Sequence, residues 1–171
     1  MQSENRTEDH SAPLVVKLGG SLHRHIPEII PLLCKSERPL LVIPGGGLLA
    51  NIVRQVTVDD DSAHWMAIAA MEQYAWFIAS HGVVATDFLA LPKKTMIFLP
   101  YISMRQRDPL PHSWDITSDT IAAWVAAELE VELLVLKSVD GILLGDIIQE
   151  WVTAPIQNKV VDPFFIPFIL K

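Results

Sequence analysis

Short apolar runs and segments of helical periodicity alternate along this chain. The apolar runs are too short for helices and are bounded by glycine, proline or charged residues, which is typical of buried strands. The segments between them repeat their apolar residues every three or four positions and predict helices. We expect strands within 14–18, 39–44, 83–90, 95–99 and 132–137, and helices over 23–35, 48–56, 62–80 and 121–129.

This alternation predicts an α/β fold, a three-layer α/β/α sandwich with a mainly parallel sheet. At 171 residues the chain suits a single domain, which we place at 13–171. The preceding tail, 1–12, is polar and mixed in charge; we expect it to be disordered and to be neither a signal peptide nor an anchor. No apolar run reaches the ~20 residues that span a bilayer, so we expect no membrane partner.

A lysine and two glycines end the first apolar run, in the segment LVVKLGGSL (14–22). A buried lysine needs an anionic partner. Glycines let backbone N–H groups approach a ligand, and a helix that starts after them points its positive end the same way. The segment therefore fits either a phosphate site or an ordinary strand-to-helix turn with a surface lysine.

The same plan recurs in the segment PLLVIPGGG (39–47). Parallel strands of an open α/β sheet hold their ligands beyond their carboxyl ends. Two glycine turns that each end a buried strand would therefore lie side by side at one edge of the sheet. This pairing favours a bound polyanion over two unrelated turns.

The charge of the chain limits the classes of partner it can bind, and its cysteine content indicates the cellular compartment. The chain has 13 basic and 20 acidic residues, a formal net charge of −7 and no basic stripe, which argues against nucleic acid as a partner. An anionic substrate must then be held by local groups against the overall field. The single cysteine, Cys34, predicts a buried thiol in a reducing cytoplasm.

Two further segments complete a recognisable pattern, WDITSDT (114–120) and VLKSVDG (135–141). Together with the two glycine turns they resemble the amino acid kinase family, which includes acetylglutamate kinase, aspartokinase, carbamate kinase and uridylate kinase. The segments 64–74 and 114–120 look closest to the branch of aminomethylfuran-methyl phosphate kinases of methanofuran biosynthesis. The resemblance covers most of the chain and implies transfer of the γ-phosphoryl group of ATP to a carboxylate, carbamate or phosphate.

The resemblance also implies roles for individual residues. Lys17 and Asp119 would be catalytic: Lys17 binds the transferring phosphoryl group, and Asp119 orients the lysines of the transfer site. Mg²⁺ would bridge nucleotide oxygens, with no protein ligand assigned. Backbone N–H groups of Gly19, Gly20, Gly45 and Gly46 would surround the phosphoryl group. The nucleotide would contact Gly19, Gly20, Ser21, Lys137, Asp140 and Gly141, and the acceptor would contact Gly45, Gly46, Gly47, Asp115 and Ser118.

The residues alone leave some of these assignments open. Ser118, Asp119 and Thr120 also suit the start of a helix, where polar side chains act as caps. Asp140 and Gly141 also suit an ordinary turn. The segment 101–112 predicts a loop, in which Arg105 and Arg107 either grip the acceptor or are solvated.

The helix expected at 62–80 is apolar nearly all round and must be covered on every side. We therefore expect one of its faces to meet a second subunit, and the resemblance implies a homodimer through this helix. The acidic run at 59–61 predicts a helix cap by Asp61 or Ser62 rather than a metal site. His64 remains open between an acceptor contact and an interface or cap histidine.

The segment 144–171 departs from the family pattern, because the region that surrounds the adenine is shorter than usual. It lacks a Gly-Gly-Met motif and the second lysine that follows it; Lys159 is the late basic residue nearest in place, apart from Lys137 and Lys171. We expect ATP-dependent phosphoryl transfer to a small anionic acceptor, including an aminomethylfuran phosphate of C1-carrier cofactor biosynthesis. The alternatives are a non-catalytic phosphometabolite-binding or subunit-partner module, and a scaffold dimer whose loops bind nothing.

Overall fold

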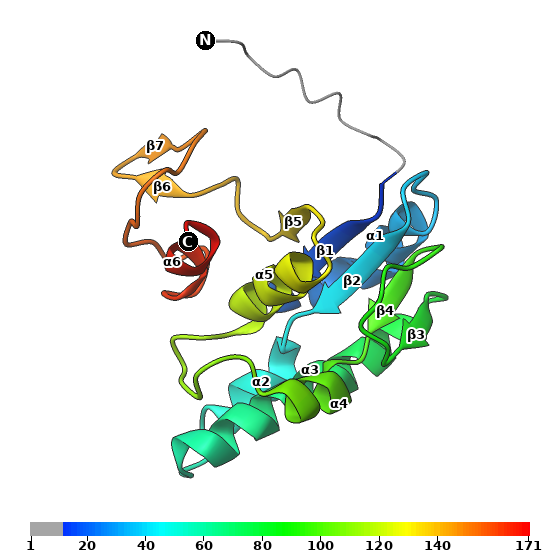
Figure 1. Ribbon diagram of the computed structural model, residues 1–171, viewed down its shortest axis with the longest axis horizontal. Helices are drawn as coiled ribbons and strands as arrows, with labels where there is room; N and C mark the ends of the chain where they lie inside the picture. Colours follow the sequence, from blue (N-terminus) through cyan, green and yellow to red (C-terminus); the bar gives the residue numbers. More distant parts are fainter. Residues whose placement is uncertain (1–11) are drawn as a thin grey trace.

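The computed structural model describes residues 12–171 and forms an α/β fold around a five-stranded parallel sheet (Figure 1). This confirms the fold class expected from the sequence. The predicted tail at 1–12 lies outside the described residues except for Ala12, whose carbonyl accepts a hydrogen bond from Arg38 Nε at 2.7 Å. The strands are β1 (Leu14–Leu18), β2 (Leu40–Pro44), β3 (Val84–Thr86), β4 (Met96–Phe98) and β5 (Leu133–Leu136), in the order β3-β4-β2-β1-β5.

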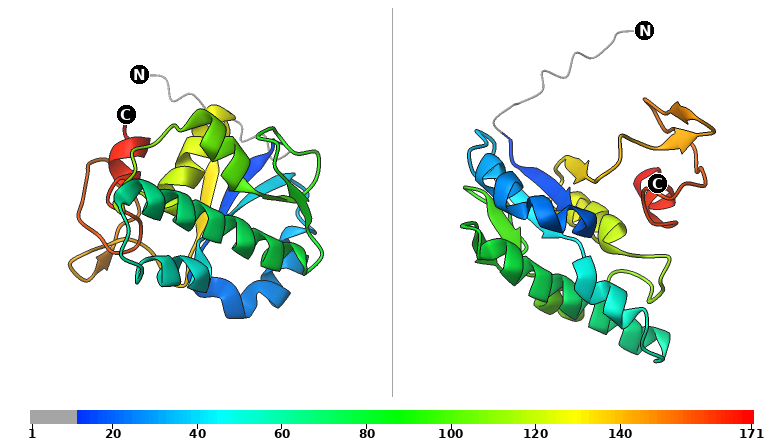
Figure 2. Two further views of the ribbon diagram at one scale, coloured as in Figure 1. Left: turned by 90° about the horizontal axis from the view of Figure 1, so that it is seen from below. Right: turned by 180° about the vertical axis from the view of Figure 1, so that it is seen from behind.

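Helices connect the strands, except that a loop joins β3 to β4, and a short hairpin stands apart from the sheet (Figures 1 and 2). No helix within residues 12–171 is both long and apolar enough to cross a membrane. The helices are the 3₁₀ helix η1 (Gly20–His25) and the α-helices α1 (Ile26–Leu33), α2 (Gly47–Val53), α3 (Asp60–Ala79), α4 (Pro100–Arg107), α5 (Ser118–Glu128) and α6 (Phe165–Ile169); the hairpin is β6 (Leu143–Leu144) and β7 (Ile147–Ile148).

Alternation along the central strands divides the core between the two faces of the sheet. Val15 and Leu41 pack in a buried cluster with α4, α5 and the first half of α3. Val16 and Val42, one position further on, pack with α1 and the second half of α3. In Figure 1, α5 lies in front of the sheet and α1 behind it. Burial on both faces explains why β1 and β2 are continuous apolar runs rather than alternating ones.

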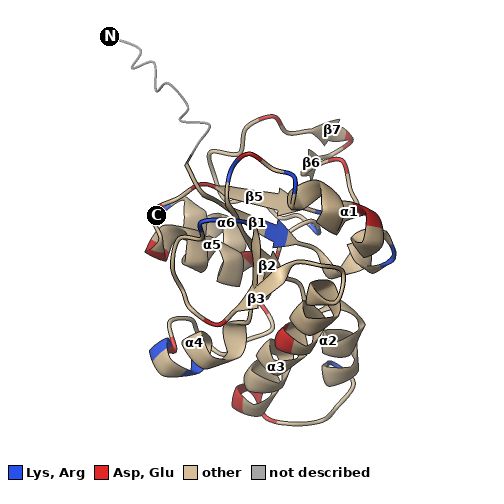
Figure 3. Ribbon diagram, turned by 90° about the vertical axis from the view of Figure 1, so that its right-hand side faces the viewer, with Lys and Arg blue, Asp and Glu red and all other residues tan. Residues whose placement is uncertain are grey.

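The strand register brings three turns to one edge of the sheet. β1 lies between β2 and β5, with Lys17 opposite Ile43 on one side and Val135 on the other. The turns that follow β1, β2 and β5 are therefore neighbours. Lys17 is also the only charged residue among the five strands of the described sheet, and Figure 3 shows this basic position near the end of β1.

Two local predictions were wrong. The expected loop at 101–112 contains a helix, α4, because Pro100 suits a first helical position and Glu72 accepts the free N–H of Tyr101 at 2.8 Å. The cap of α3 is Asp59 rather than Asp61 or Ser62, since its carboxylate accepts from both the N–H and the hydroxyl of Ser62 at 2.8 Å. These bonds favour the charged form and lower the pKa of Asp59.

Burial also differs from expectation in two places. Cys34 is exposed rather than buried, because it follows the last residue of α1 on the solvent side of that helix. β5 is an edge strand whose Leu134 is exposed, so the prediction of a fully buried strand there was wrong. An apolar run identifies a strand but not its place in the sheet.

Candidate phosphoryl-transfer site

The two glycine turns touch each other backbone to backbone. The N–H of Gly45 donates to the carbonyl of Leu18 at 2.8 Å. A Cβ on Gly20 would lie 2.5 Å from the nitrogen of Gly47, and one on Gly45 would lie 2.6 Å from the nitrogen of Gly20. No side chain fits at either contact, so glycine is required here for close approach of the two chains.

This contact corrects the expected set of N–H donors. The N–H of Gly45 is used by Leu18, and the N–H of Gly19 donates to the carbonyl of Leu136 at 2.9 Å. These two groups hold the turns in place and are not free for a ligand. Among the described residues, the N–H groups of Gly20 and Gly46 have no such backbone acceptor, and both residues line the adjoining pocket.

A triad of two lysines and one aspartate lies at the same edge of the sheet, with Lys17 and Asp119 buried and Lys137 partly buried. Lys17 Nζ is 2.7 Å from Asp119 Oδ1, and Lys137 Nζ is 2.6 Å from Asp119 Oδ2. Lys17 is 4% exposed and Asp119 is 3% exposed. Lys137 also donates to the carbonyl of Val160. The carboxylate thus holds one ammonium group on each oxygen, at the point where β1, β5 and α5 meet.

Burial dominates the electrostatics of Lys17. Desolvation lowers its pKa, the Asp119 carboxylate opposes that shift, and the positive charge of Lys137 adds to it. An additional anion near both ammonium groups would favour their charged forms. The geometry therefore offers two cations to one negatively charged group.

The structure gives Asp119 a support that sequence reasoning missed. Asp162 is 6% exposed and accepts hydrogen bonds from the N–H groups of Thr117, Thr120 and Phe165 and from both threonine hydroxyls, at 2.5–3.0 Å. A carboxylate at this place satisfies the free N–H groups of the first turn of α5 and complements its dipole. Asp162 comes from a segment more than 40 positions away, so no local pattern identifies it.

The turn after β5 lies beside the first glycine turn. Ser138 Oγ donates to Ser21 Oγ at 2.9 Å, which joins the two turns across the edge of the sheet. Asp140 is exposed, and a Cβ on Gly141 would lie 2.9 Å from the side chain of Ile148 in the hairpin. Ser21 and Lys137 are thus at the edge that carries the triad, whereas Gly141 packs against β7.

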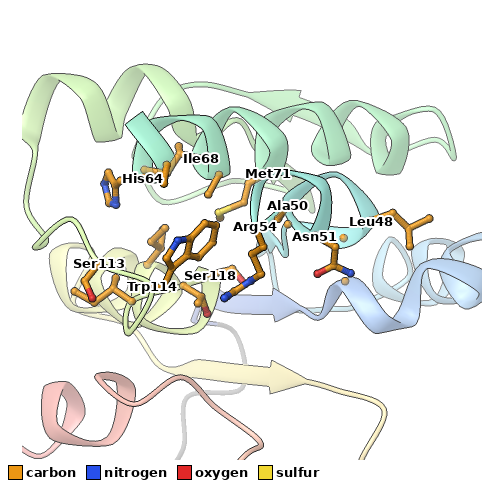
Figure 4. A pocket seen from close by; sticks show the side chains of 18 of the residues that line it. Leu48, Ala50, Asn51, Arg54, His64, Ile68, Met71, Ser113, Trp114 and Ser118 are labelled. Atoms are coloured by element: carbon orange, nitrogen blue, oxygen red, sulfur yellow. The ribbon is translucent and has the colours of Figure 1, made fainter. Parts of the chain in front are cut away.

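A pocket of about 410 Å³ opens next to the glycine turns (Figure 4). Trp114 and Arg54 lie side by side within it, with the guanidinium carbon 4.1 Å from the centroid of the indole ring. Trp114 is the first residue of the 114–120 motif, to which no individual role was given from the sequence, and Arg54 was not singled out. Some residues of the predicted site line the pocket, namely Gly20, Ser21, Gly46, Gly47 and Ser118. The lining also includes Arg54, Asp60, His64, Met71 and Trp114, to which the prediction gave no site role.

His64 lines the same pocket and is 8% exposed. Burial, together with the neighbouring His112, lowers the pKa of His64 to about 4, so the ring is neutral near pH 7. A neutral imidazole acts as a hydrogen-bond partner rather than as a cation for the acceptor.

Three residues considered in the sequence lie elsewhere. The side chain of Asp115 is exposed and does not line the pocket. Arg105 lies over the ring of Trp65, at 4.3 Å from the centroid, and Arg107 pairs with Glu128 at 2.7 Å. Neither arginine reaches the pocket, so the structure supports neither as an acceptor ligand.

Comparisons with known proteins find one relative by sequence and one similar solved structure. The chain is 31% identical over 144 residues to [5-(aminomethyl)furan-3-yl]methyl phosphate kinase of Methanocaldococcus jannaschii, covering 75% of this chain and 67% of that protein. Its fold is similar to the crystal structure of uridylate kinase from Archaeoglobus fulgidus, with a TM-score of 0.54, 18% identity, and coverage of 82% of this chain and 68% of the other. No family model matches the chain.

Proposed function

Because the chain belongs to the amino acid kinase family, its chemistry is ATP-dependent phosphoryl transfer, and we propose that the Lys17–Asp119–Lys137 triad is where the phosphoryl group passes. The triad is the observation that carries the proposal. Two ammonium groups, one buried and one partly buried, lie 2.7 and 2.6 Å from one carboxylate and supply positive charge at a fixed place. Phosphoryl transfer needs positioning and charge neutralisation more than covalent help from the protein.

Each member of the triad has a distinct task in this proposal. Lys17 binds the transferring phosphoryl group, and Asp119 positions the ammonium groups of Lys17 and Lys137 next to that group. Lys137 takes the place of the second lysine that the sequence pattern lacks, because the end of β5 brings it to the other oxygen of Asp119. The free N–H groups of Gly20 and Gly46 donate to phosphoryl oxygens as they approach.

The residues of the triad and of the neighbouring turns suit the binding of ATP together with a divalent metal. ATP supplies the γ-phosphoryl group, and Mg²⁺ would neutralise charge on its oxygens. Each oxygen of Asp119 lies beside an ammonium group, so the charge of this carboxylate is already balanced and we do not assign it as a metal ligand. We therefore assign the metal to nucleotide oxygens, with Ser21 and Lys137 facing the nucleotide from the turns after β1 and β5.

The pocket beside the glycine turns takes the acceptor. Arg54 offers a guanidinium group to a phosphate or carboxylate, and Trp114 offers an aromatic face to a ring. Asp60 in the same lining offers a carboxylate to an amine. These groups match the three parts in the name of the M. jannaschii enzyme's acceptor, a phosphate, a furan and an aminomethyl group. We propose an acceptor of this class.

A homodimer through α3 is part of the proposal. Met66, Trp76 and Phe77 on this helix are exposed, although the helix packs on the sheet with its other side chains. Covering them would remove apolar surface from water. The mass of the protein in solution, measured by light scattering, tests this assembly.

The test of the proposed function is ADP release from ATP and Mg²⁺ with a panel of acceptors. We expect turnover with an aminomethylfuran methyl phosphate and little with the corresponding alcohol. Lys17→Ala should lower kcat by about 100-fold or more, because a preorganised charge at the transferring group is lost. Lys35→Ala, at an exposed lysine outside the site, is the matched control and should keep the rate.

Two outcomes would overturn the proposal. One is a folded Lys17→Ala protein, checked by circular dichroism, that releases ADP at the unaltered rate. The other is a protein that binds phosphorylated metabolites in calorimetry without ever consuming ATP. The second outcome would favour the non-catalytic binding module.

A further inference from the structure

A cluster of histidines and carboxylates lies at the pocket wall, outside the transfer triad. His64 on α3 and His112 in the segment before α5 stack with ring centroids 4.1 Å apart. Asp108, at the end of α4, places Oδ1 2.8 Å from His112 Nε2. One ligand atom each from His64, Asp108 and His112 lie within 4.8 Å of one another, and within residues 12–171 this is the only such group.

We propose that His64, Asp108 and His112 bind a divalent transition-metal ion, with zinc as the reference ion. Imidazole nitrogen and carboxylate oxygen are donors that suit zinc and its neighbours, whereas Mg²⁺ prefers oxygen ligands alone. Three protein ligands leave one position of a tetrahedral ion open. This ion is separate from the divalent metal that accompanies ATP.

The first support is an unpartnered nitrogen. His64 is 8% exposed, yet its Nε2 atom has no hydrogen-bond partner among the described residues. Buried polar atoms normally have a partner, and each exception calls for one. A metal ion beside the stacked rings would satisfy this nitrogen.

The second support is the carboxylate on the far side of His112. Asp61 Oδ1 lies 2.7 Å from His112 Nδ1, while Asp108 faces Nε2. A histidine that binds metal through one nitrogen normally donates its other N–H to a carboxylate, which fixes the tautomer and the ring orientation. Asp61 is placed to serve as this outer carboxylate.

The third support is the backbone and position of Asp108. It has φ 42° and ψ 56°, the left-handed conformation, and follows the last residue of α4. A carboxylate at a helix carboxyl terminus is opposed by the negative end of the helix dipole. A cation bound there would offset that repulsion.

The required movement is small. A tetrahedral zinc ion with bonds of about 2.0–2.1 Å keeps its ligand atoms about 3.4 Å apart. The ligand atoms lie within 4.8 Å of one another, so the His64 nitrogen must approach the other two by up to about 1.4 Å, while Asp108 Oδ1 and His112 Nε2, 2.8 Å apart, must separate slightly. Rotation of the exposed Asp108 side chain and a tilt of the stacked rings can supply these shifts. Bound metal would fasten α3, the end of α4 and the segment before α5 at one end of the pocket.

Cobalt titration of chelator-treated full-length protein tests the site. We expect one Co²⁺ per chain with the visible absorption of a four-coordinate ion, displaced by Zn²⁺ and not by millimolar Mg²⁺. Saturating Zn²⁺ should raise the melting temperature by about 5 °C, because metal binds the folded chain. Neither readout depends on kinase activity, so failure here leaves the proposed function untouched.

The variants locate the ion. His112→Ala should abolish the cobalt spectrum, and Asp108→Asn, which keeps its size, should weaken binding by at least about 10-fold. Asp61→Asn should weaken it about 10–100-fold, as loss of an outer carboxylate does. His25→Ala, at an exposed histidine that pairs with Glu28, is the matched control and should bind as the unaltered protein does.

Three results would overturn the site. One is the absence of stoichiometric cobalt binding by the unaltered protein. Another is equal binding by His112→Ala and by His25→Ala, which would place the ion elsewhere. The third is displacement by Mg²⁺, which would show an oxygen site. Melting without metal, compared across the variants, separates loss of ligands from loss of folding.

Discussion

The two sides of the Lys17–Asp119–Lys137 triad are built in different ways. Lys17 belongs to a central strand that is buried on both faces and paired on both edges. The segment 137–171 supplies Lys137, Val160 and Asp162, yet its hairpin is exposed and Trp151 is 80% exposed. One side is fixed by the sheet, and the other by the polar contacts of Lys137 and Asp162 and by a small apolar cluster around Phe165 and Ile166. We therefore expect the C-terminal side to be the less stable of the two.

Asp162→Ala should have the largest effect on stability, because it acts on the C-terminal side of the triad. It removes the carboxylate that caps α5 and joins the C-terminal segment to it, leaving several buried donors unpaired. We expect a loss of about 3–5 kcal/mol in the free energy of unfolding, measured with urea. Asp146→Ala, at an exposed aspartate of the hairpin, should change it by less than about 0.5 kcal/mol. Equal effects of the two variants would refute the assigned role of Asp162.

Gly20→Ala tests the sheet side. Its Cβ would lie 2.5 Å from the backbone of Gly47, which cannot move without displacing the second glycine turn. We expect a loss of about 1–3 kcal/mol from overpacking, together with lower activity. The control is Gly82→Ala, where φ is +104° but no atom lies within 4 Å, so only backbone strain is added. A smaller loss at Gly20 than at Gly82 would contradict the close contact of the turns.

Tyr74→Phe probes the core beneath the second glycine turn through pH. Burial raises the pKa of Tyr74 to about 12 from an ordinary 10.0, so above pH 10 the unfolded chain loses a proton that the folded chain keeps. Tyr74 should therefore lower the free energy of unfolding by about 1.4 kcal/mol between neutral pH and pH 11.

The Phe variant should lack this alkaline loss. At neutral pH it should be as stable as the unaltered protein or more stable, because the Tyr74 hydroxyl has no partner among residues 12–171. Denaturant titrations of both proteins at pH 7 and pH 11 give the difference. Parallel losses in the two proteins would show that Tyr74 does not titrate in this way.

Trp151→Ser should have the smallest effect. The side chain is almost fully exposed, so the free energy of unfolding should change by less than about 0.5 kcal/mol. If the variant is clearly less stable, another surface covers this residue in solution. Repeating the measurement over a range of protein concentrations distinguishes a second copy of the chain from a contact within one copy.

The sequence predicted the structure best where a single short segment contained all the information that the prediction needed. The fold class, the strands β1 and β2 and the two glycine turns follow from apolar runs that end in glycine. The pairing of Lys17 with Asp119 was expected from the family pattern, and the coordinates place the two groups 2.7 Å apart. Their catalytic roles remain predictions until activity is measured.

Tertiary contacts decided what the sequence could not. Helix α4 depends on Glu72 accepting a bond from the N–H of Tyr101, across 29 positions. Asp162 acts on α5 from more than 40 positions away, and Arg54, directly after α2, reaches Trp114 in the turn before α5. Local periodicity carries no information about such partners. The expected donors Gly19 and Gly45 were wrong for a related reason, since neighbouring strand ends consume their N–H groups.

The net charge of the triad affects how this protein attracts its substrates. Two ammonium groups and one carboxylate give the triad itself one formal positive charge, beside the carboxylate of Asp162 and inside a chain whose formal charge is −7. Such a near-balanced trio can fold without a counterion, yet it still attracts polyphosphate at short range. At physiological ionic strength, dissolved salt screens the repulsion between polyphosphate and the distant acidic surface. It screens the attraction between polyphosphate and the positive charge of the triad far less.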